Sequence, residues 1–177
     1  MDEALLRLAV PAVLCALIAA SIIGSLLFNV SGTWERVRDD DDIKGKAPRE
    51  RLTLGQFGPF VRGRREVPGG WQEYSGLMWG RSLTLTRRDF GVDALTANHF
   101  PLELAQKLHG DVFAELRMTL IDDGLTLTGV FIPQKIDFLL APPRITTRHW
   151  LKPVPRGYRR VSAVELEEER AVRVGSA

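Results

Sequence analysis

Arginine is the residue type whose placement most suggests chemistry in this chain. Three groups of arginines stand where strand-like sequence is expected to end: Arg62, Arg64 and Arg65; Arg87 and Arg88; and Arg156, Arg159 and Arg160. The guanidinium group is a planar fork of donors that fits phosphate and carboxylate. If these strand ends face the same way, they predict a basic surface for anionic lipid headgroups or an acidic partner. The alternative is that the arginines only solvate strand ends and protect sheet edges.

Residues suited to catalysis or metal binding are dispersed along the chain. His99, His109 and His149 lack the one-turn helical spacing with which two histidines share a metal. The sequence contains no nucleophile elbow, no phosphate-binding glycine loop and no dinucleotide fingerprint. The carboxylates set among apolar residues are Asp89, Asp93, Glu103, Asp111 and Asp137. Turns and helix caps explain each of them, so we expect no catalytic residue, no metal ligand and no cofactor.

The cysteine content and the charge narrow the possibilities further. The only cysteine is Cys15, inside an apolar stretch, so the rest of the chain has no disulfide and no thiolate nucleophile. The formal net charge is +2, with 24 basic and 22 acidic side chains. Nucleic-acid-binding domains usually carry a strong basic excess, so we expect no nucleic-acid partner.

The N-terminal segment is the strongest clue to location. No charged residue occurs from Leu8 to Val30, and a helix of roughly 20 apolar residues crosses a bilayer. The run therefore predicts a single transmembrane anchor. A cleaved secretory signal is the alternative, but such signals begin with basic residues and have an apolar core of about 7–15 residues. Here Asp2 and Glu3 come first.

The same segment predicts a compartment and a possible assembly. Arginine greatly outnumbers lysine, which is typical of a GC-rich bacterial genome, so we expect the bacterial inner membrane. More basic residues follow the apolar run than precede it, which favours a cytoplasmic domain over a periplasmic one. Small residues recur every four positions along the run, and such stripes let membrane helices pack closely, in a homodimer or with another protein. The stripe consists of Ala12, Ala16, Ala20 and Gly24.

Strand patterns dominate the middle of the chain. Leu83 to Thr86 and Leu125 to Thr128 alternate leucine with threonine, as half-buried strands do. The Asp123–Gly124 step supplies the backbone conformations of a tight hairpin turn. Together the patterns predict a β-rich, all-β or α+β fold: a small antiparallel sandwich or partly open barrel of about seven strands.

Two helices are expected beside these strands. Pro101, a run of leucines and Gly110 predict one short internal helix. Ser162 and Glu165 have capping-box spacing and predict a C-terminal helix. The expected organisation is an anchor over 1–31, a charged juxtamembrane linker over 32–51, a soluble β-rich domain over 52–152, and a proline-containing spacer with a charged helix and tail over 153–177.

These features favour association over catalysis. We expect a membrane-anchored, non-catalytic interaction or scaffold domain, an accessory subunit of a membrane-associated assembly. A tethered β-barrel that binds lipid or a small ligand is the alternative, because glycines within strands such as Gly76 and Gly129 leave room for a cavity or mark bends. An enzyme that uses the dispersed carboxylates is the third possibility.

Overall fold

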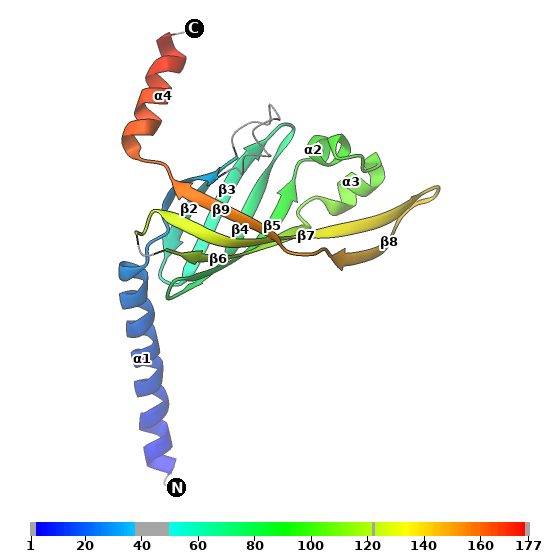
Figure 1. The fold of residues 1–177 in the computed structure, drawn as a ribbon. Coiled ribbons are helices and arrows are strands. Elements are labelled where there is room, and N and C mark those ends of the chain that lie inside the picture. The colour runs from blue at the N-terminus through cyan, green and yellow to red at the C-terminus, as the bar shows by residue number, and fades with distance from the viewer. Residues whose placement is uncertain (1–2, 38–49, 122, 176–177) are drawn as a thin grey trace.

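The protein is described by a computed structural model of residues 1–177. The description covers 3–37, 50–121 and 123–175 (Figure 1), and the side chains of residues 3–8, 21, 22, 25, 26, 169, 170 and 173–175 lie outside it. The described helices are α1 (Glu3–Leu27), α2 (Val92–Ala97), α3 (Leu102–Leu108) and α4 (Ala163–Gly175). The described strands are β1 (Gly32–Val37), β2 (Arg51–Phe57), β3 (Phe60–Val67), β4 (Gly70–Trp79), β5 (Ser82–Phe90), β6 (Val112–Leu120), β7 (Thr126–Leu140), β8 (Pro143–Trp150) and β9 (Val154–Arg160).

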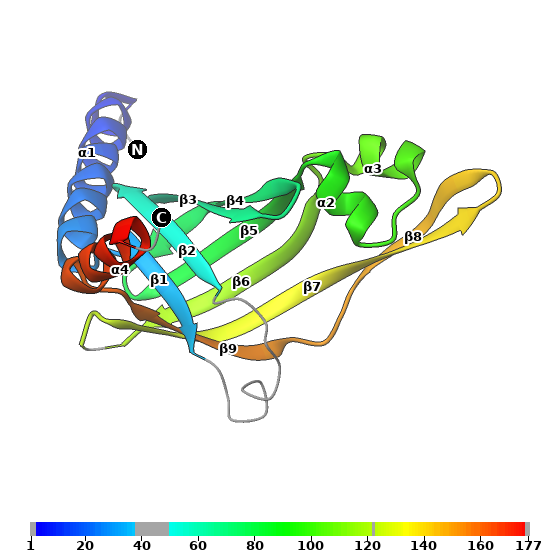
Figure 2. The same ribbon diagram turned by 90° about the horizontal axis from the view of Figure 1, so that it is seen from above.

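Eight of these strands close into an antiparallel barrel. Strands β1 to β6 pair in chain order, β6 pairs with β7, β7 with β9, and β9 returns to β1. Figure 2 shows the ring from above. The expectation of a β-rich antiparallel fold is confirmed, and of the two architectures left open the barrel is the one found, closed rather than partly open.

Closure depends on two strands that lie in segments expected to be irregular. Strand β1 occupies part of the predicted linker over 32–51, and β9 occupies the predicted spacer after 153. The two pair directly, with Trp34 opposite Arg160. Because each strand is short and rich in charge, only its pairing partners stabilise it as a strand. The acidic run 39–42 of the same predicted linker lies outside the described residues.

The expected hairpin between β6 and β7 is confirmed. Gly124 has a φ of 66°, the left-handed conformation that favours glycine. The carboxylate of Asp123 accepts hydrogen bonds from the backbone N–H of Leu125, at 2.7 Å, and of Thr126, at 3.0 Å. These bonds set the register of the two strands at their turn.

Two strand glycines, Gly76 and Gly129, lie where the backbone of the neighbouring strand approaches closely. A Cβ atom at Gly76 would clash with the carbonyl oxygen of Thr84, and one at Gly129 would clash with that of Arg117. Both positions lie where the neighbouring strand's backbone approaches closely. These two glycines therefore give no support to an internal cavity.

The chain has two apolar cores, one inside the barrel and one outside it beneath α2 and α3. The main core fills the barrel with side chains from every barrel strand, including Trp34, whose indole N–H donates to the carbonyl of Val30 at 2.8 Å. The second core packs α2 and α3 against β7 and β8, around Leu104, Leu108 and Ile136. The predicted internal helix corresponds to α3, and α2 was not expected.

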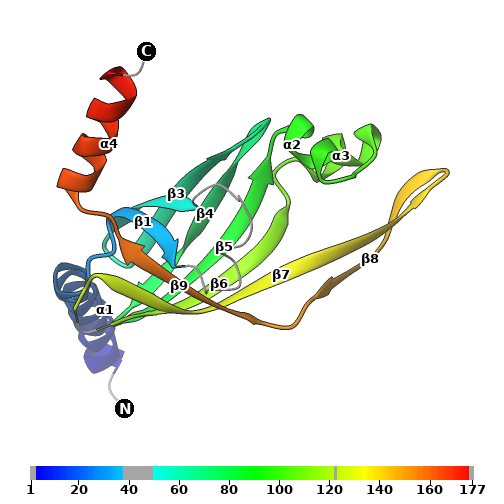
Figure 3. The same cartoon turned by 45° about the horizontal axis from the view of Figure 1, so that its top comes forward.

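Strand β7 is much longer than the barrel needs. Its first half pairs with β6 and β9, and its second half pairs with β8 alone. The resulting β7–β8 hairpin projects beyond the barrel wall as an arm (Figure 3). Strand β8 pairs with no other described strand, so its outer edge is open.

Helix α1 extends away from the barrel (Figure 1). Its described side chains from 9 to 20 are all exposed. Within the part of the chain that the structure describes, no helix combines the length and apolar content needed to cross a bilayer. The transmembrane span predicted over Leu8–Val30 is therefore not supported.

Helix α4 begins with the predicted capping box. The side chain of Glu165 accepts from the backbone N–H of Ser162 at 3.0 Å, and the Ser162 hydroxyl accepts from the backbone N–H of Glu165 at 3.2 Å. Arg159 of β9 also donates to Glu165 at 3.0 Å. The C-terminal helix is thus confirmed, and it projects from the barrel on the side opposite α1 (Figure 1).

Candidate functional site

The inside of the barrel has two chemically different ends. The end from which α1 leaves, here called the α1 end, is filled by Val30, Trp34 and leucines of the main core. At the opposite end, beside α2, the inward rows of the strands change from apolar to charged. We call this the arginine end and define it by seven inward side chains: Arg36, Glu50, Arg65, Gln72, Arg87, Asp89 and Arg156.

Glu50 is the centre of the first cluster at the arginine end. Its residue is 8% exposed. One carboxylate oxygen, Oε1, accepts from the Tyr158 hydroxyl at 3.0 Å and from Arg156 Nη1 at 3.3 Å, and lies 3.3 Å from Arg65 Nη1. The other oxygen, Oε2, lies 3.7 Å from Arg36 Nη1. One buried carboxylate thus faces three guanidinium groups.

Asp89 is the centre of the second cluster. Its Oδ2 accepts from Arg87 Nη2 at 3.0 Å and from Gln72 Nε2 at 3.3 Å, and its Oδ1 lies 2.8 Å from Arg87 Nε. The amide oxygen of Gln72 in turn accepts from the Tyr74 hydroxyl at 3.2 Å. Burial raises the pKa of the Asp89 carboxyl above its usual value, although Arg87 and the hydrogen bonds partly lower it.

Aromatic side chains separate the two ends. Burial raises the pKa of the hydroxyls of Tyr74 and Tyr158, which keeps both protonated and able to donate. The guanidinium of Arg156 lies 4.1 Å from the centre of the Phe131 ring, and that of Arg87 lies 5.5 Å from it. The Phe131 ring therefore contacts one arginine of each cluster. The face of an aromatic ring attracts cations, so these contacts help to hold both guanidinium groups in place.

The arginine end carries an excess of positive charge. Among the described side chains, four guanidinium groups face two carboxylates. In addition, Nε of Arg156 is buried and has no hydrogen-bond partner among the described residues. A buried donor without an acceptor costs free energy, so this end of the barrel favours the arrival of a group with acceptor atoms and negative charge.

A cavity reaches this end from the direction of α2. Its volume is about 310 Å³, at the lower limit of ordinary small-ligand sites. Arg65, Gln72 and Asp89 form its polar wall, and Asn98 at the end of α2 adds a further polar side chain. The apolar remainder comes from the β3–β4 and β5–α2 regions and from α2 itself: Val67, Pro68, Trp71, Phe90, Ala94, Leu95 and Ala97. The cavity suits a small molecule with an apolar body and a polar group directed toward the barrel interior.

The predicted arginine groups do not form one basic surface. Arg65, Arg87 and Arg156 point inward, and each belongs to the clusters just described. Arg62, Arg64 and Arg88 instead line a groove of about 560 Å³ on the outside of β3, β4 and β5. The remaining two lie elsewhere: Arg159 beside α4, and Arg160 over the Trp34 ring at 4.8 Å.

Several residues of the arginine end were missed by the sequence reasoning. Arg36, Glu50 and Gln72 belong to it, and the aromatic residues Tyr74, Phe131 and Tyr158 border it. The signal that could have found part of the site is alternation: in β5, Leu83, Leu85, Arg87 and Asp89 occupy one face. An apolar row that continues as charge at the same spacing indicates charge inside a barrel.

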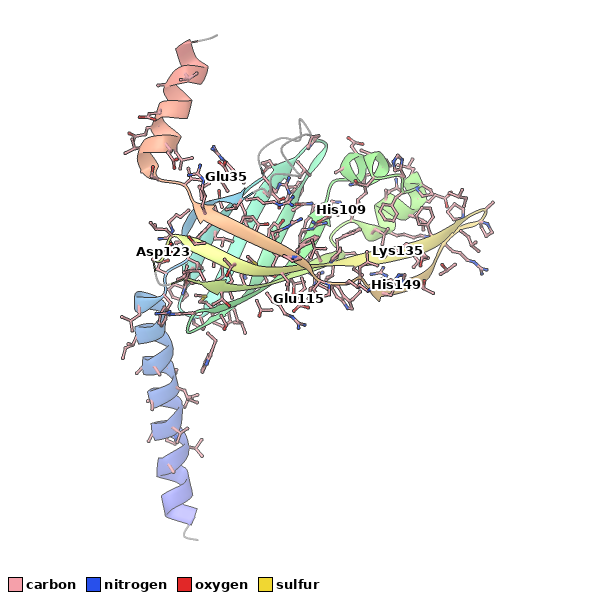
Figure 4. All side chains as sticks on the ribbon, viewed as in Figure 1. Glu35, His109, Glu115, Asp123, Lys135 and His149 are labelled. Atoms are coloured by element: carbon pink, nitrogen blue, oxygen red, sulfur yellow. The ribbon has the colours of Figure 1, made fainter. Side chains whose placement is uncertain are left out.

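The dispersed carboxylates and histidines do not converge. Asp111 is paired with Arg148 at 2.6 Å, and Asp137 with Lys135 at 2.8 Å. Asp93 and Glu103 lie in the first turns of α2 and α3, but the N-cap positions are Gly91 and Pro101 and neither has a side-chain cap hydrogen bond. His109, Lys135 and His149 lie toward the arm, well away from Glu35 and Asp123 (Figure 4). Among the described residues, no group of three or more histidine, cysteine or acidic side chains is arranged to hold a metal ion.

The small-residue stripe lies along α1. Ala12, Ala16 and Ala20 are exposed, and a Cβ atom at Gly24 would meet nothing within 4 Å. Packing of α1 against another helix therefore remains a prediction. The second helix could belong to another copy of this chain or to a different membrane protein.

Fold and site together define a class: a closed eight-stranded antiparallel β-barrel with a charged interior end and an exposed apolar N-terminal helix. Comparison with protein-family models, with curated proteins and with solved structures finds no match for this chain. Any function must therefore be argued from the geometry itself.

Proposed function

We propose that this protein is a membrane-attached, ligand-binding β-barrel whose site is the arginine end and the cavity beside it. The ligand is a small molecule with an anionic group and an apolar body. The observation that carries the proposal is the placement of four half-buried arginines against two carboxylates next to a cavity of about 310 Å³.

The charge balance supports an anionic ligand. Charges in a partly buried site are screened less by water and salt than charges at the surface. The two excess guanidinium groups at the arginine end therefore attract a carboxylate, sulfonate or phosphate more strongly than surface arginines do. Their fork of donors also accommodates two oxygens of one anionic group.

The cavity walls support an apolar body of limited size. Trp71 and Phe90 stack with ring centres 5.3 Å apart and parallel planes, and Leu95 of α2 lies on the same cavity. Apolar and aromatic walls with a few convergent polar groups are typical of small-ligand sites. A long acyl chain does not fit a cavity of this volume, because the barrel interior beyond it is filled by the main core.

Attachment to a membrane is the second part of the proposal. Large apolar side chains of α1, including Val10, Leu14 and Ile18, are exposed. An apolar surface of this extent on a protein indicates a membrane or another protein as its cover. We propose that α1 lies in the bacterial inner membrane, with the barrel in the cytoplasm, as the distribution of basic residues favours.

The test uses the full chain in phosphatidylcholine nanodiscs and titrates naphthalene-1-sulfonate, a rigid aromatic anion, by calorimetry. We expect saturable binding that weakens at least tenfold in Arg65→Gln. The matched control is Arg62→Gln, which removes an arginine from the outer groove, and it should bind as the unaltered chain does. Melting curves of each variant separate loss of binding from loss of fold. Equal weakening in both variants, or no saturable binding beyond that of empty nanodiscs, would refute an anion site here.

A scaffold role is the second candidate, and the arm favours it. Strand β8 has one open edge, and such edges pair with strands of other proteins. Arg144 adds a basic side chain to this strand, whereas Arg148 is already paired with Asp111. Replacing Thr146 with Pro would block pairing along the edge, so the expected result is loss of a co-purifying partner without loss of naphthalene-1-sulfonate binding.

A further inference from the structure

Three hairpin turns surround the base of α1 at the α1 end of the barrel. The first joins β2 to β3, the second joins β4 to β5, and the third joins β6 to β7. Their position follows from register: Gly32, just after α1, pairs with Leu54 near the end of β2, and Phe60 at the start of β3 pairs with Leu77 near the end of β4. Figure 4 labels Asp123, in the third turn, beside the barrel end of α1.

The first two turns expose large apolar side chains on the outer face. Phe57 is 87% exposed and Phe60 is 62% exposed, and they are cross-strand partners. Leu77 lies opposite Phe60, and Trp79, 74% exposed, ends the same strand. We call these four residues the turn patch. Their neighbours Val61 and Met78 point into the core, so the apolar side chains of the turn patch are additional to those the fold needs.

The third turn adds two more exposed apolar side chains at the α1 end. Ile121 and Leu125 flank the Asp-Gly turn and are both exposed. Scattered exposed apolar residues are ordinary on a protein surface. Here, however, they come from three separate turns at the same end of the barrel, around the helix with the most exposed apolar surface.

Helix α1 is joined firmly to this end. Phe28, at the end of α1, packs against the main core, and Arg81 of the second turn lies over its ring at 5.7 Å. Val30 is fully buried, and its backbone N–H donates to the side chain of Gln56 at 2.9 Å. The residues that join α1 to β1 are therefore fixed to the barrel, which places the base of α1 at the same end as the three turns.

We infer that the turn patch docks onto the surface of the lipid bilayer that holds α1. A bilayer can enclose the part of α1 that follows Arg7, which is uncharged, and also contact the three turns at its base, since it presents a continuous plane. Tryptophan and other aromatic side chains favour the interface between headgroups and acyl chains. The inference rests on the proposed membrane attachment and adds a second contact, which orients the arginine end away from the lipid.

The two exposed tryptophans at opposite ends of the barrel provide the test. Trp79 belongs to the turn patch, whereas Trp150 ends β8, opposite Gln134 and beyond the far end of the barrel. The full chain is reconstituted in vesicles of dioleoylphosphatidylcholine, with or without phosphatidylcholine brominated near the headgroup, which quenches tryptophan on contact. We expect quenching in the unaltered chain, loss of most of it in Trp79→Phe, and no loss in Trp150→Phe.

Each other outcome is decisive. If the chain floats with the vesicles but Trp79→Phe leaves quenching unchanged, the docking inference is wrong while membrane attachment stands. If quenching is lost in Trp150→Phe instead, the opposite end faces the lipid and the inference is also wrong. If the chain does not float with the vesicles at all, both the attachment and the docking are refuted. The remaining tryptophans do not confuse the readout, because Trp34 is fully buried and Trp71 lies at the arginine end.

Discussion

The two ends of one barrel use the same alternation of side chains for opposite purposes. At the α1 end, Leu83 and Leu85 of β5 face inward and pack with Trp34 in a dry core. Two and four residues later on the same face, Arg87 and Asp89 point inward at the arginine end. A dry core stabilises the fold through area removed from water. Paired buried charges contribute little net stability, because desolvation offsets their attraction.

This contrast separates the part of the barrel that maintains the fold from the part available for binding. Buried charges that cost free energy are commonly kept at functional sites. We therefore expect substitutions at the α1 end to act mainly on stability, and substitutions at the arginine end to act on both stability and ligand affinity.

The largest expected effect is at the α1 end. Replacing Trp34 with Ala removes the largest fully buried side chain and its hydrogen bond to Val30. The free energy of unfolding should fall by about 3–5 kcal/mol, measured by denaturant titration. Trp79→Ala is the matched control, and because Trp79 is mostly exposed its effect should stay within about 0.5 kcal/mol. A small effect at Trp34 would place the core elsewhere.

A smaller loss is expected from Glu50→Gln at the arginine end. Three guanidinium groups then lose the charge that compensates them, and we expect a loss of about 2–3 kcal/mol, below the full value for buried pairs because these side chains keep some contact with water. Binding of naphthalene-1-sulfonate should become tighter, since the positive excess grows. Glu66→Gln, whose partner Arg64 is exposed, should leave stability unchanged within about 0.5 kcal/mol. Weaker binding in Glu50→Gln would contradict the electrostatic explanation.

Phe131→Leu tests the boundary between the two ends. The variant keeps an apolar side chain but removes the ring beside Arg156 and Arg87. We expect a loss of about 1 kcal/mol in unfolding free energy, the size of a partly desolvated cation–π contact. Phe90→Leu provides a comparison, because its ring stacks on Trp71 rather than on a cation. Salt-dependent destabilisation only in Phe131→Leu would support the assignment, and identical behaviour of the two variants would argue against it.

The smallest effects concern pH. Burial raises the pKa of Asp89 in the folded protein. Its contribution to the free energy of unfolding is therefore fully present below the pKa that Asp89 has in the unfolded chain, and it is lost as the pH rises through the pKa of the folded protein. Asp123 behaves oppositely, because hydrogen bonds from Leu125 and Thr126 lower its pKa. Its contribution is present above the pKa that Asp123 has in the unfolded chain and is lost as the pH falls through its pKa in the folded protein. Carboxyl carbon NMR titration should place the two midpoints on opposite sides of the ordinary aspartate value, and midpoints in the reverse order would contradict both assignments.

Sequence patterns predicted the secondary structure correctly where residues close together in the sequence determine it. The Asp123–Gly124 hairpin, the α3 helix and the Ser162–Glu165 capping box were all predicted from residues a few positions apart. Strands β1 and β9 were not, since a short charged strand is stabilised by partners that are distant in the sequence. The prediction therefore left a sandwich and a partly open barrel as alternatives, and the structure is a closed barrel.

The candidate site was predictable only in part, for the same reason. Arg65, Arg87 and Arg156 were singled out, but they were expected at the surface with Arg62, Arg64 and Arg88. Alternation within one strand tells which residues share a face, whereas closure of the barrel decides which face is inside. Glu50, which comes just before β2 and follows residues outside the description, had no local signal at all.

The sequence by itself determined the β-rich character of the chain, its hairpins and helix caps, and the uncharged run that forms most of α1, because each depends on residues near one another. Only the tertiary structure decided that eight strands close, that one end of the interior is apolar and the other holds arginines around Glu50 and Asp89, and that three apolar turns surround the base of α1. The physical reason is that closure brings strands from both ends of the chain into contact, and those contacts determine which side chains leave the water.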